Sequence, residues 1–352
     1  MDNSISYLYF LPLPIILTWF LLDIVRKLSI KLKIFAIPNE RSSHDKIIPT
    51  TGGVALCLAF LSVLFFYNLL VDFDFGNDIY YFAVSGVIIS IVGFYDDINE
   101  MGSFIKLILQ IFVFFIISLA DNNLINSFHG LFGIYELGYY ESITFSLFVF
   151  IVIVNSINLV DGIDGLSSSL SLYFLVIVSY FFYIASNPFY LLSISFSACV
   201  LVFIFFNYSK KNKIFLGDTG SLGLGLVLAV ISLGWLNTNQ QYSVALPINP
   251  ALFTVLMIAY PLLDVIRVFL LRIYKGESFM VADRNHLHHK LINIGLSHFK
   301  SVILILFFQS SLLLFNVFII PELSLHYQII VNIIVLTFLL VFLYRIPDKS
   351  VS

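Results

Sequence analysis

Residues 143–165 read ITFSLFVFIVIVNSINLVDGIDG, an apolar run that ends in a series of polar side chains. A helix that crosses a membrane needs about 20 residues, and the run from 143 to 160 is close to that length. An ionisable side chain at membrane depth costs about 2.5 to 3.5 kcal/mol on insertion scales. The stretch therefore predicts a membrane-spanning helix with functional groups at one end.

The composition of the whole chain agrees with this interpretation. Of the 352 residues, 60% are hydrophobic and only 11% are charged, whereas soluble domains are about half apolar and about a quarter charged. A soluble globular domain is therefore excluded. The net charge is −3, and no basic block or stripe indicates a nucleic-acid partner. We expect a single integral-membrane domain over residues 1–352.

Hydropathy predicts eleven spans, and hence an all-α polytopic membrane protein. The spans are 6–25, 52–71, 79–95, 104–120, 143–160, 166–186, 189–207, 219–236, 251–271, 301–320 and 327–345. With the N-terminus outside and the C-terminus in the cytoplasm, all 18 Lys and Arg residues lie on the cytoplasmic side, as the positive-inside rule requires. Glycines and aromatic residues at 127–142 favour a short external β-hairpin.

In this topology, carboxylate and amide side chains gather at the cytoplasmic ends of several spans. Asn155, Asn158 and Asp161 recur at every third residue, which keeps them on adjoining parts of one helix face; the alternative role is hydrogen bonding between helices. Asp96 and Asp97 end the third span, where two like charges repel unless a cation or a proton compensates. The alternative there is a pair of solvated loop acids.

The eighth span begins with Asp218 between two glycines, which is a helix start where backbone N–H groups can approach a phosphate. Because a carboxylate repels phosphate, Asp218 is more reasonable as a Mg²⁺ ligand that bridges to a diphosphate; an ordinary helix cap is the alternative. The loop after the ninth span offers phosphate donors or, less favourably without nearby cysteines, a zinc site; a solvated basic loop is the remaining alternative. Its candidate residues are Arg284, His286, His288 and His289.

Acidic metal ligands, a glycine-lined helix start and a His/Arg loop on one face together indicate phosphoryl transfer from a magnesium-bound diphosphate. With almost no soluble domain, the acceptor is expected to be a lipid. Mn²⁺ is a candidate substitute for Mg²⁺. The alternative from a different class is an ion-coupled polytopic transporter, but its acids should lie near mid-bilayer rather than at one interface.

These motifs resemble a known family, the polyprenyl-phosphate N-acetylhexosamine-1-phosphate transferases. The resemblance covers nearly the whole chain and rests on Pro49 to Gly53, Gly93 to Asp97, Lys106 with Gln110, Asn155 to Leu166, Gly217 to Gly225, and Asp283 to Leu291. It implies a multi-pass enzyme of the bacterial inner membrane whose active site is on the cytoplasmic face. The implied partners are a UDP-N-acetylhexosamine, undecaprenyl phosphate and the bilayer, and a homodimer is a candidate assembly.

The resemblance also implies a role for each matching residue. Catalytic roles are implied for four carboxylates: Asp96, Asp97, Asp161 and Asp164. Mg²⁺ ligation is implied for Asp218 and Asp97. Substrate binding is implied for Lys46, Thr51, Lys106, Asn155, Asn158, Asp161, Arg284, His286, His288 and His289.

Two departures from the family pattern separate its branches. The branch that transfers phospho-N-acetylmuramoyl-pentapeptide has a Lys three positions after the paired acids and three consecutive histidines. Here Glu100 takes the Lys position and Leu287 interrupts the histidines. The chain looks instead like the branch that starts O-antigen, common-antigen or teichoic-acid linkage units. This favours transfer of N-acetylglucosamine 1-phosphate with release of UMP, while the 4-epimer or a deoxy analogue stays open. Direct attack by the lipid phosphate is favoured over a covalent aspartyl-phosphate.

Overall fold

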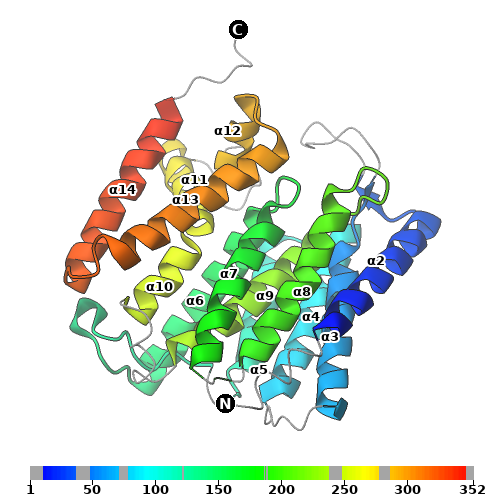
Figure 1. Ribbon diagram of the computed structural model, residues 1–352, viewed down its shortest axis with the longest axis horizontal. Helices are drawn as coiled ribbons and strands as arrows, with labels where there is room; N and C mark the ends of the chain where they lie inside the picture. Colours follow the sequence, from blue (N-terminus) through cyan, green and yellow to red (C-terminus); the bar gives the residue numbers. More distant parts are fainter. Residues whose placement is uncertain are drawn as a thin grey trace.

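The structure, a computed structural model, describes residues 11–36, 48–70, 78–120, 123–185, 187, 189–237, 248–276 and 286–345. These residues form a helical bundle (Figure 1). The helices are α2 (Pro12–Leu32), α3 (Gly52–Leu70), α4 (Asp78–Asn99), α5 (Ser103–Ile117), α6 (Tyr139–Leu159), α7 (Leu166–Ile184), α8 (Phe189–Tyr208), α9 (Gly217–Leu236), α10 (Pro250–Met257), α11 (Ala259–Lys275), α12 (Leu287–Asn293), α13 (His298–Phe318) and α14 (Leu325–Arg345). The 3-10 turn η2 (Leu131–Gly133) and the antiparallel strands β1 (Phe35–Ala36) and β2 (Ile48–Pro49) complete the described elements.

Where the structure describes it, each predicted span overlaps one helix or, for 251–271, the pair α10 and α11. Within the described residues, six helices are long and apolar enough to cross a membrane, and the bent pair makes up to seven. Shorter apolar helical segments cover Gly52–Phe66, Ser103–Ile117 and Leu325–Phe338. The all-helical, multi-pass membrane class is therefore confirmed. The number of eleven crossings and the orientation of the termini stay predictions.

The predicted ninth span is not one straight helix, because α10 and α11 meet at an angle of 72°. Pro261 lies in the first turn of α11 and has no N–H to donate to the carbonyl of Met257 four residues earlier. The side chain of Gln309 from α13 replaces the lost bond by donating to Met257 O. Its own oxygen accepts the backbone N–H of Tyr260 at 3.1 Å. A broken helix is tolerated at membrane depth when a neighbouring helix satisfies the freed backbone groups in this way.

The predicted hairpin at 127–142 is wrong, because the described loop between α5 and α6 contains η2 and no strand. His129 and Phe132 have φ angles of 53° and 55°, which extended strands do not adopt. The ring of His129 bonds to Leu236 O at 2.8 Å, and Asn249 Nδ2 donates to His129 O at 2.7 Å. The loop is thus held by the ends of neighbouring helices rather than by a partner strand.

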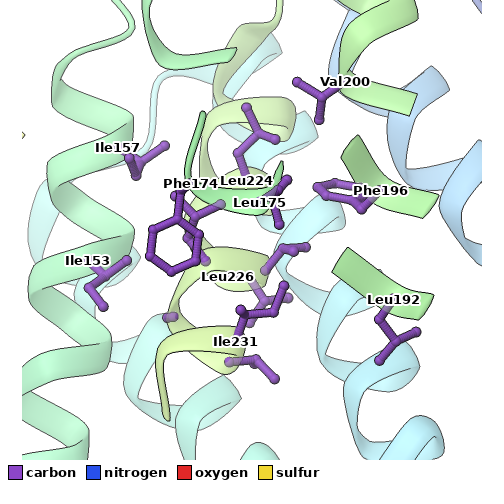
Figure 2. Close-up of a cluster of buried hydrophobic side chains, with 14 of the residues drawn as sticks. Ile153, Ile157, Phe174, Leu175, Leu192, Phe196, Val200, Leu224, Leu226 and Ile231 are labelled. Atoms are coloured by element: carbon purple, nitrogen blue, oxygen red, sulfur yellow. The ribbon is translucent and has the colours of Figure 1, made fainter. Parts of the chain in front are cut away.

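Helix α9 lies in the middle of the bundle, among α3, α4, α6, α7 and α8 (Figure 1). Its most apolar stretch is 94% buried, and Figure 2 shows Leu224, Leu226 and Ile231 among side chains from α6, α7 and α8. A Cβ on Gly225 would lie 2.7 Å from Val154 Cα of α6, so only glycine allows this approach of the two helices. The packing fixes the position of the start of α9, where Asp218 lies.

A second apolar cluster packs the short helix α12 against the loop between α6 and α7. Its buried members come from that loop and from α7, α11, α12 and α13: Val160, Ile163, Leu166, Leu170, Tyr260, Leu287, Leu291, Val302 and Ile305. Both the loop and α12 lie at the end of the bundle where α9 begins (Figure 1). The histidine segment, residues 286–289, and the Asp161–Gly165 loop therefore form one packed unit.

Candidate active site

An open cavity of about 310 Å³ lies at the end of the bundle where α9 begins. Its walls come from Thr50 between β2 and α3, the end of α4, the end of α6 and the loop that follows it, α7, α8, and the segment that leads into α9. The lining includes five residues that the sequence predicted for the site: Asp97, Asn158, Asp161, Asp164 and Asp218. Residues from distant parts of the sequence thus meet at one cavity.

Close backbone contacts bring the helices of this site together. A Cβ on Gly93 of α4 would lie 2.5 Å from Thr219 Cα, and a Cβ on Gly53 of α3 would lie 2.0 Å from the backbone nitrogen of Gly220. No side chain fits at either position without displacing the backbone of α9. These glycines therefore set the end of α4 and the start of α3 directly against the first turn of α9.

Asp97 caps the N-terminus of α9. Its Oδ1 accepts the backbone N–H of Asp218 at 2.7 Å, and its Oδ2 accepts the backbone N–H and the hydroxyl of Thr219 at 3.1 and 2.7 Å. A carboxylate at this position satisfies free helix N–H groups and interacts favourably with the helix dipole. The structure brings Asp97 and Asp218 together, as a shared metal site requires, although Asp97 also has this structural role.

Asp218 lies between an amine and an amide. Its Oδ1 accepts Asn158 Nδ2 at 2.8 Å, and its Oδ2 is 3.4 Å from Lys106 Nζ. Lys106 also donates to Asp96, which accepts the backbone N–H of Met101 as well. The side chain of Asp218 is 36% exposed, whereas that of Asp96 is 6% exposed. Of the two carboxylates, Asp218 is therefore the one open to a ligand in the cavity.

The described residues contain no group of three His, Cys, Asp or Glu side chains arranged to hold a metal ion. Mg²⁺ does not require such a cage, because it usually keeps several waters and binds one or two carboxylates together with substrate phosphates. The oxygens of Asp218, with Asp97 adjacent, fit that demand. Mg²⁺ ligation by these two residues stays a prediction.

Asp161 and Asp164 lie on the loop between α6 and α7 in different electrostatic environments. Burial raises the pKa of Asp161 to about 7, with the charges of Asp97 and Asp164 adding to the effect and the hydroxyl of Ser167, 2.5 Å away, opposing it. Near neutral pH this carboxyl group is close to half protonated. A group with such a pKa suits proton transfer.

Asp164 is held by two basic side chains. Its Oδ2 accepts Lys213 Nζ at 2.6 Å and His298 Nδ1 at 2.9 Å, and its carbonyl accepts the hydroxyl of Tyr208 at 2.9 Å. Burial alone would raise the pKa of Asp164, but the bonds from His298 and Lys213 outweigh it and lower that pKa. Asp164 thus links the cavity wall to α8 and α13, and its predicted catalytic role remains to be tested.

Among the predicted substrate-binding residues outside the cavity lining, Asn155 and Thr51 join neighbouring helices. Asn155 forms an amide pair with the fully buried Gln110 of α5, with bonds of 2.7 and 3.3 Å. Thr51 bonds to Ser29 between α3 and α2. Both contacts fit the role of joining helices, which was the alternative for Asn155. Two further predicted residues, Lys46 and Arg284, fall outside the described residues.

The histidine segment lies behind the cavity wall. His288 Nε2 and His289 Nε2 are 2.3 and 3.1 Å from the position that a Cβ on Gly162 would take, and Gly162 lines the cavity. His286 Nδ1 bonds to Asp264 of α11 at 2.8 Å. Burial lowers the pKa of His288, which favours a neutral ring rather than the charged phosphate donor that we expected from sequence.

Sequence reasoning missed several side chains that complete this region. Ser221 accepts Asn158 Nδ2 at 2.8 Å, and Lys213 and His298 hold Asp164. The sequence showed Asp264 as an acid inside an apolar run, which is by default a sign of function. Its partner could not be identified, because it lies more than 20 residues further along the chain.

Comparison with known proteins gives a consistent result. The family model described as Glycosyl transferase family 4 matches residues 79–236. A probable undecaprenyl-phosphate N-acetylglucosaminyl 1-phosphate transferase of Bacillus subtilis is 30% identical over 287 residues, which is 80% of this chain and 76% of the relative. A decaprenyl-phosphate N-acetylglucosaminephosphotransferase of Mycobacterium leprae is 30% identical over 311 residues, covering 82% and 78%. The undecaprenyl-phosphate alpha-N-acetylglucosaminyl 1-phosphate transferase of Escherichia coli K12 is 27% identical over 297 residues, covering 82% and 77%.

Proposed function

The chain belongs to the polyprenyl-phosphate N-acetylhexosamine-1-phosphate transferases of glycosyl transferase family 4, and from this membership we propose that it transfers N-acetylglucosamine 1-phosphate from UDP-N-acetylglucosamine to undecaprenyl phosphate. UMP is released, and the lipid-linked sugar starts a cell-envelope polysaccharide. In this proposal the reaction takes place at the cytoplasmic face of a bacterial inner membrane, the side from which a nucleotide sugar would reach the cavity.

One observation carries the proposal most directly: Asp218, Asp97, Asn158 and Lys106 meet at the first turn of α9 beside the cavity. A lysine beside the positive end of a helix dipole favours phosphate oxygens. Asp218 and Asp97 are the residues that would hold Mg²⁺, which would neutralise charge on the diphosphate. A neutral substrate would fit this arrangement of charged groups less well than a diphosphate.

In the proposed reaction, an oxygen of the lipid phosphate bonds to the β-phosphorus of the donor as the bond from that phosphorus to the bridging oxygen breaks. The electron pair leaves with UMP. Phosphate monoesters are largely ionised at pH 7, so the attacking oxygen needs little help from a base. Lys106 and the start of α9 orient the phosphates, and Asp161 can hold or release a proton at the cavity wall. Isolation of an aspartyl-phosphate with the donor alone would contradict direct attack.

The test uses the purified full chain with undecaprenyl phosphate, Mg²⁺ and one UDP-sugar at a time. We expect UMP release and a lipid product with the mass of an added N-acetylhexosamine phosphate from UDP-N-acetylglucosamine, and loss of both with EDTA. UDP-N-acetylgalactosamine and UDP-N-acetylmuramoyl-pentapeptide serve as matched donors. A product only with the pentapeptide donor would support the muramoyl branch instead, and no UMP with any donor would favour the transporter class.

A further inference from the structure

Asp264 is a buried carboxylate for which the proposed reaction has no use. It lies on α11, in the second half of the broken span, and its side chain is 0% exposed. It does not line the cavity at the start of α9. Burying a carboxylate is costly unless it is well hydrogen-bonded, so the position needs an explanation.

Both oxygens of Asp264 bond to the segment that begins α12. Oδ2 accepts His286 Nδ1 at 2.8 Å, and Oδ1 accepts the backbone N–H of Leu287 at 2.8 Å. His288 Nδ1 lies 3.6 Å from Oδ2 and 3.5 Å from the hydroxyl of Tyr260. A carboxylate at Nδ1 keeps the proton of the imidazole on that nitrogen, whether the ring is neutral or charged. The bond therefore leaves Nε2 of His286 for other partners, whereas Nδ1 of His288 lies beyond hydrogen-bond distance of the carboxylate.

The remaining ring nitrogen of His288 faces the wall of the cavity. His288 is 0% exposed, and its Nε2 has no hydrogen-bond partner among the described residues. This atom lies against Gly162, next to Asp161 on the cavity loop. The ring of His288 stacks on that of His286, with centroids 5.4 Å apart and planes inclined by 16°. A shift of either ring would therefore change the packing against Gly162.

We infer that Asp264 is a positioning residue of the transferase site: through His286 and His288 it sets the proton position and the direction of the histidine rings behind Gly162. The inference rests on the proposed function for its kinetic part only. In this arrangement the ring of His288 stacks on the oriented ring of His286 and directs its Nε2 atom at Gly162 in the cavity wall. Asp264 itself touches no substrate.

The decisive variant is Asp264→Asn, which keeps the size of the side chain and removes its charge. Loss of the partner that orients a functional histidine typically costs about 10- to 100-fold. We expect a loss of that order in kcat with little change in the KM for UDP-N-acetylglucosamine. Asp264→Glu keeps a carboxylate and should recover a large part of the activity.

A spectroscopic measurement separates positioning from a purely structural tie. In the full chain labelled with ¹⁵N-histidine, the ring signals of His286 and His288 are assigned by His286→Gln and His288→Gln. We expect protonated Nδ1 for His286 in the parent protein and an altered protonation pattern in Asp264→Asn. This measurement needs no substrate, so it decides the arrangement even if the proposed reaction fails the UMP assay.

The control for lost buried hydrogen bonds is Asn332→Ala, which breaks the buried amide pair between Asn316 and Asn332, far along the chain from the histidine segment. It should lower the thermal unfolding midpoint and leave kcat per folded molecule unchanged. If Asp264→Asn behaves like this control and the histidine signals do not change, Asp264 is only a structural tie and the inference is overturned. Full activity in Asp264→Asn would overturn it equally.

Discussion

Asp218 and Asp264 are both acids in apolar helices, yet the structure uses them in opposite ways. Asp218 lies at the start of α9, is 36% exposed and faces a cavity. Asp264 lies inside α11, is 0% exposed and directs both oxygens at the protein itself. In this molecule the acid at a helix start is open to a ligand, whereas the acid within a helix organises its neighbours.

The largest effect should come from Asp218→Asn, which removes the exposed charge but keeps the side-chain size. We expect UMP release to fall by about 100- to 1,000-fold, the usual cost of removing one charge-stabilising group from an active site, with unchanged folding. The matched control is Asp23→Asn, at an acid of α2 paired with Lys27, which should keep full activity. If UMP release fell equally in both variants, Asp218 would have no special role in binding a ligand.

The glycine contacts that hold α3 and α4 against the first turn of α9 give the next prediction. Gly53→Ala places a Cβ 2.0 Å from the nitrogen of Gly220, and overpacking of this kind costs about 1 to 3 kcal/mol in unfolding free energy. Gly86→Ala on α4 is the control, since a Cβ there meets nothing within 4 Å. Thermal unfolding in detergent should separate the two, and a stable Gly53→Ala would contradict the close contact.

Asn155 and Asn158 test the same comparison on a single helix. Asn158→Ala removes a hydrogen bond to the Asp218 carboxylate, and bonds to charged groups contribute about 1.5 to 3 kcal/mol, so kcat/KM should fall at least about tenfold. Asn155→Ala leaves Gln110 unpaired and should lower the unfolding midpoint while activity per folded molecule stays the same. If Asn155→Ala lowered kcat/KM and Asn158→Ala lowered only the unfolding midpoint, Asn155 rather than Asn158 would belong to the site.

The smallest effect concerns Asp161, whose pKa is raised by burial to about 7 from the ordinary value of 3.8 for an aspartate. The folded state binds this proton more tightly than the unfolded state, so the stabilisation is present below pH 3.8 and is lost as the pH rises to about 7. Asp161→Asn should flatten this part of the curve of unfolding midpoint against pH, measured with EDTA present. If the parent protein and Asp161→Asn gave the same curve, Asp161 would be an ordinarily solvated acid.

Much of the architecture could be predicted because its causes are local. The apolar runs located every described helix except the short α12, since a spanning segment must be apolar over its own length. The polar ends of those runs indicated Asp97, Asn158 and Asp218, which do meet at one cavity. Their helix-end positions, combined with alternating topology, were enough to place them on one face.

The features that could not be predicted depend on contacts between distant residues. The break after Met257 is stabilised by Gln309, some 50 residues later, and Asn155 is occupied by Gln110 of another helix. In the same way, hairpin-like residues at 127–142 fold into η2 because Asn249 and Leu236 supply partners for His129. No pattern within a single segment contains this information.

The two hydrogen bonds that Gln309 makes across the broken span have a mechanical consequence. Because one amide side chain bonds to Met257 on one side of the break and to Tyr260 on the other, the hinge cannot flex without losing both bonds at once. Each such bond contributes about 0.5 to 1.5 kcal/mol, and α13 would have to move as well. We therefore expect substrate exchange to proceed by motion of loops, with the angle between α10 and α11 fixed, rather than by rocking of α11.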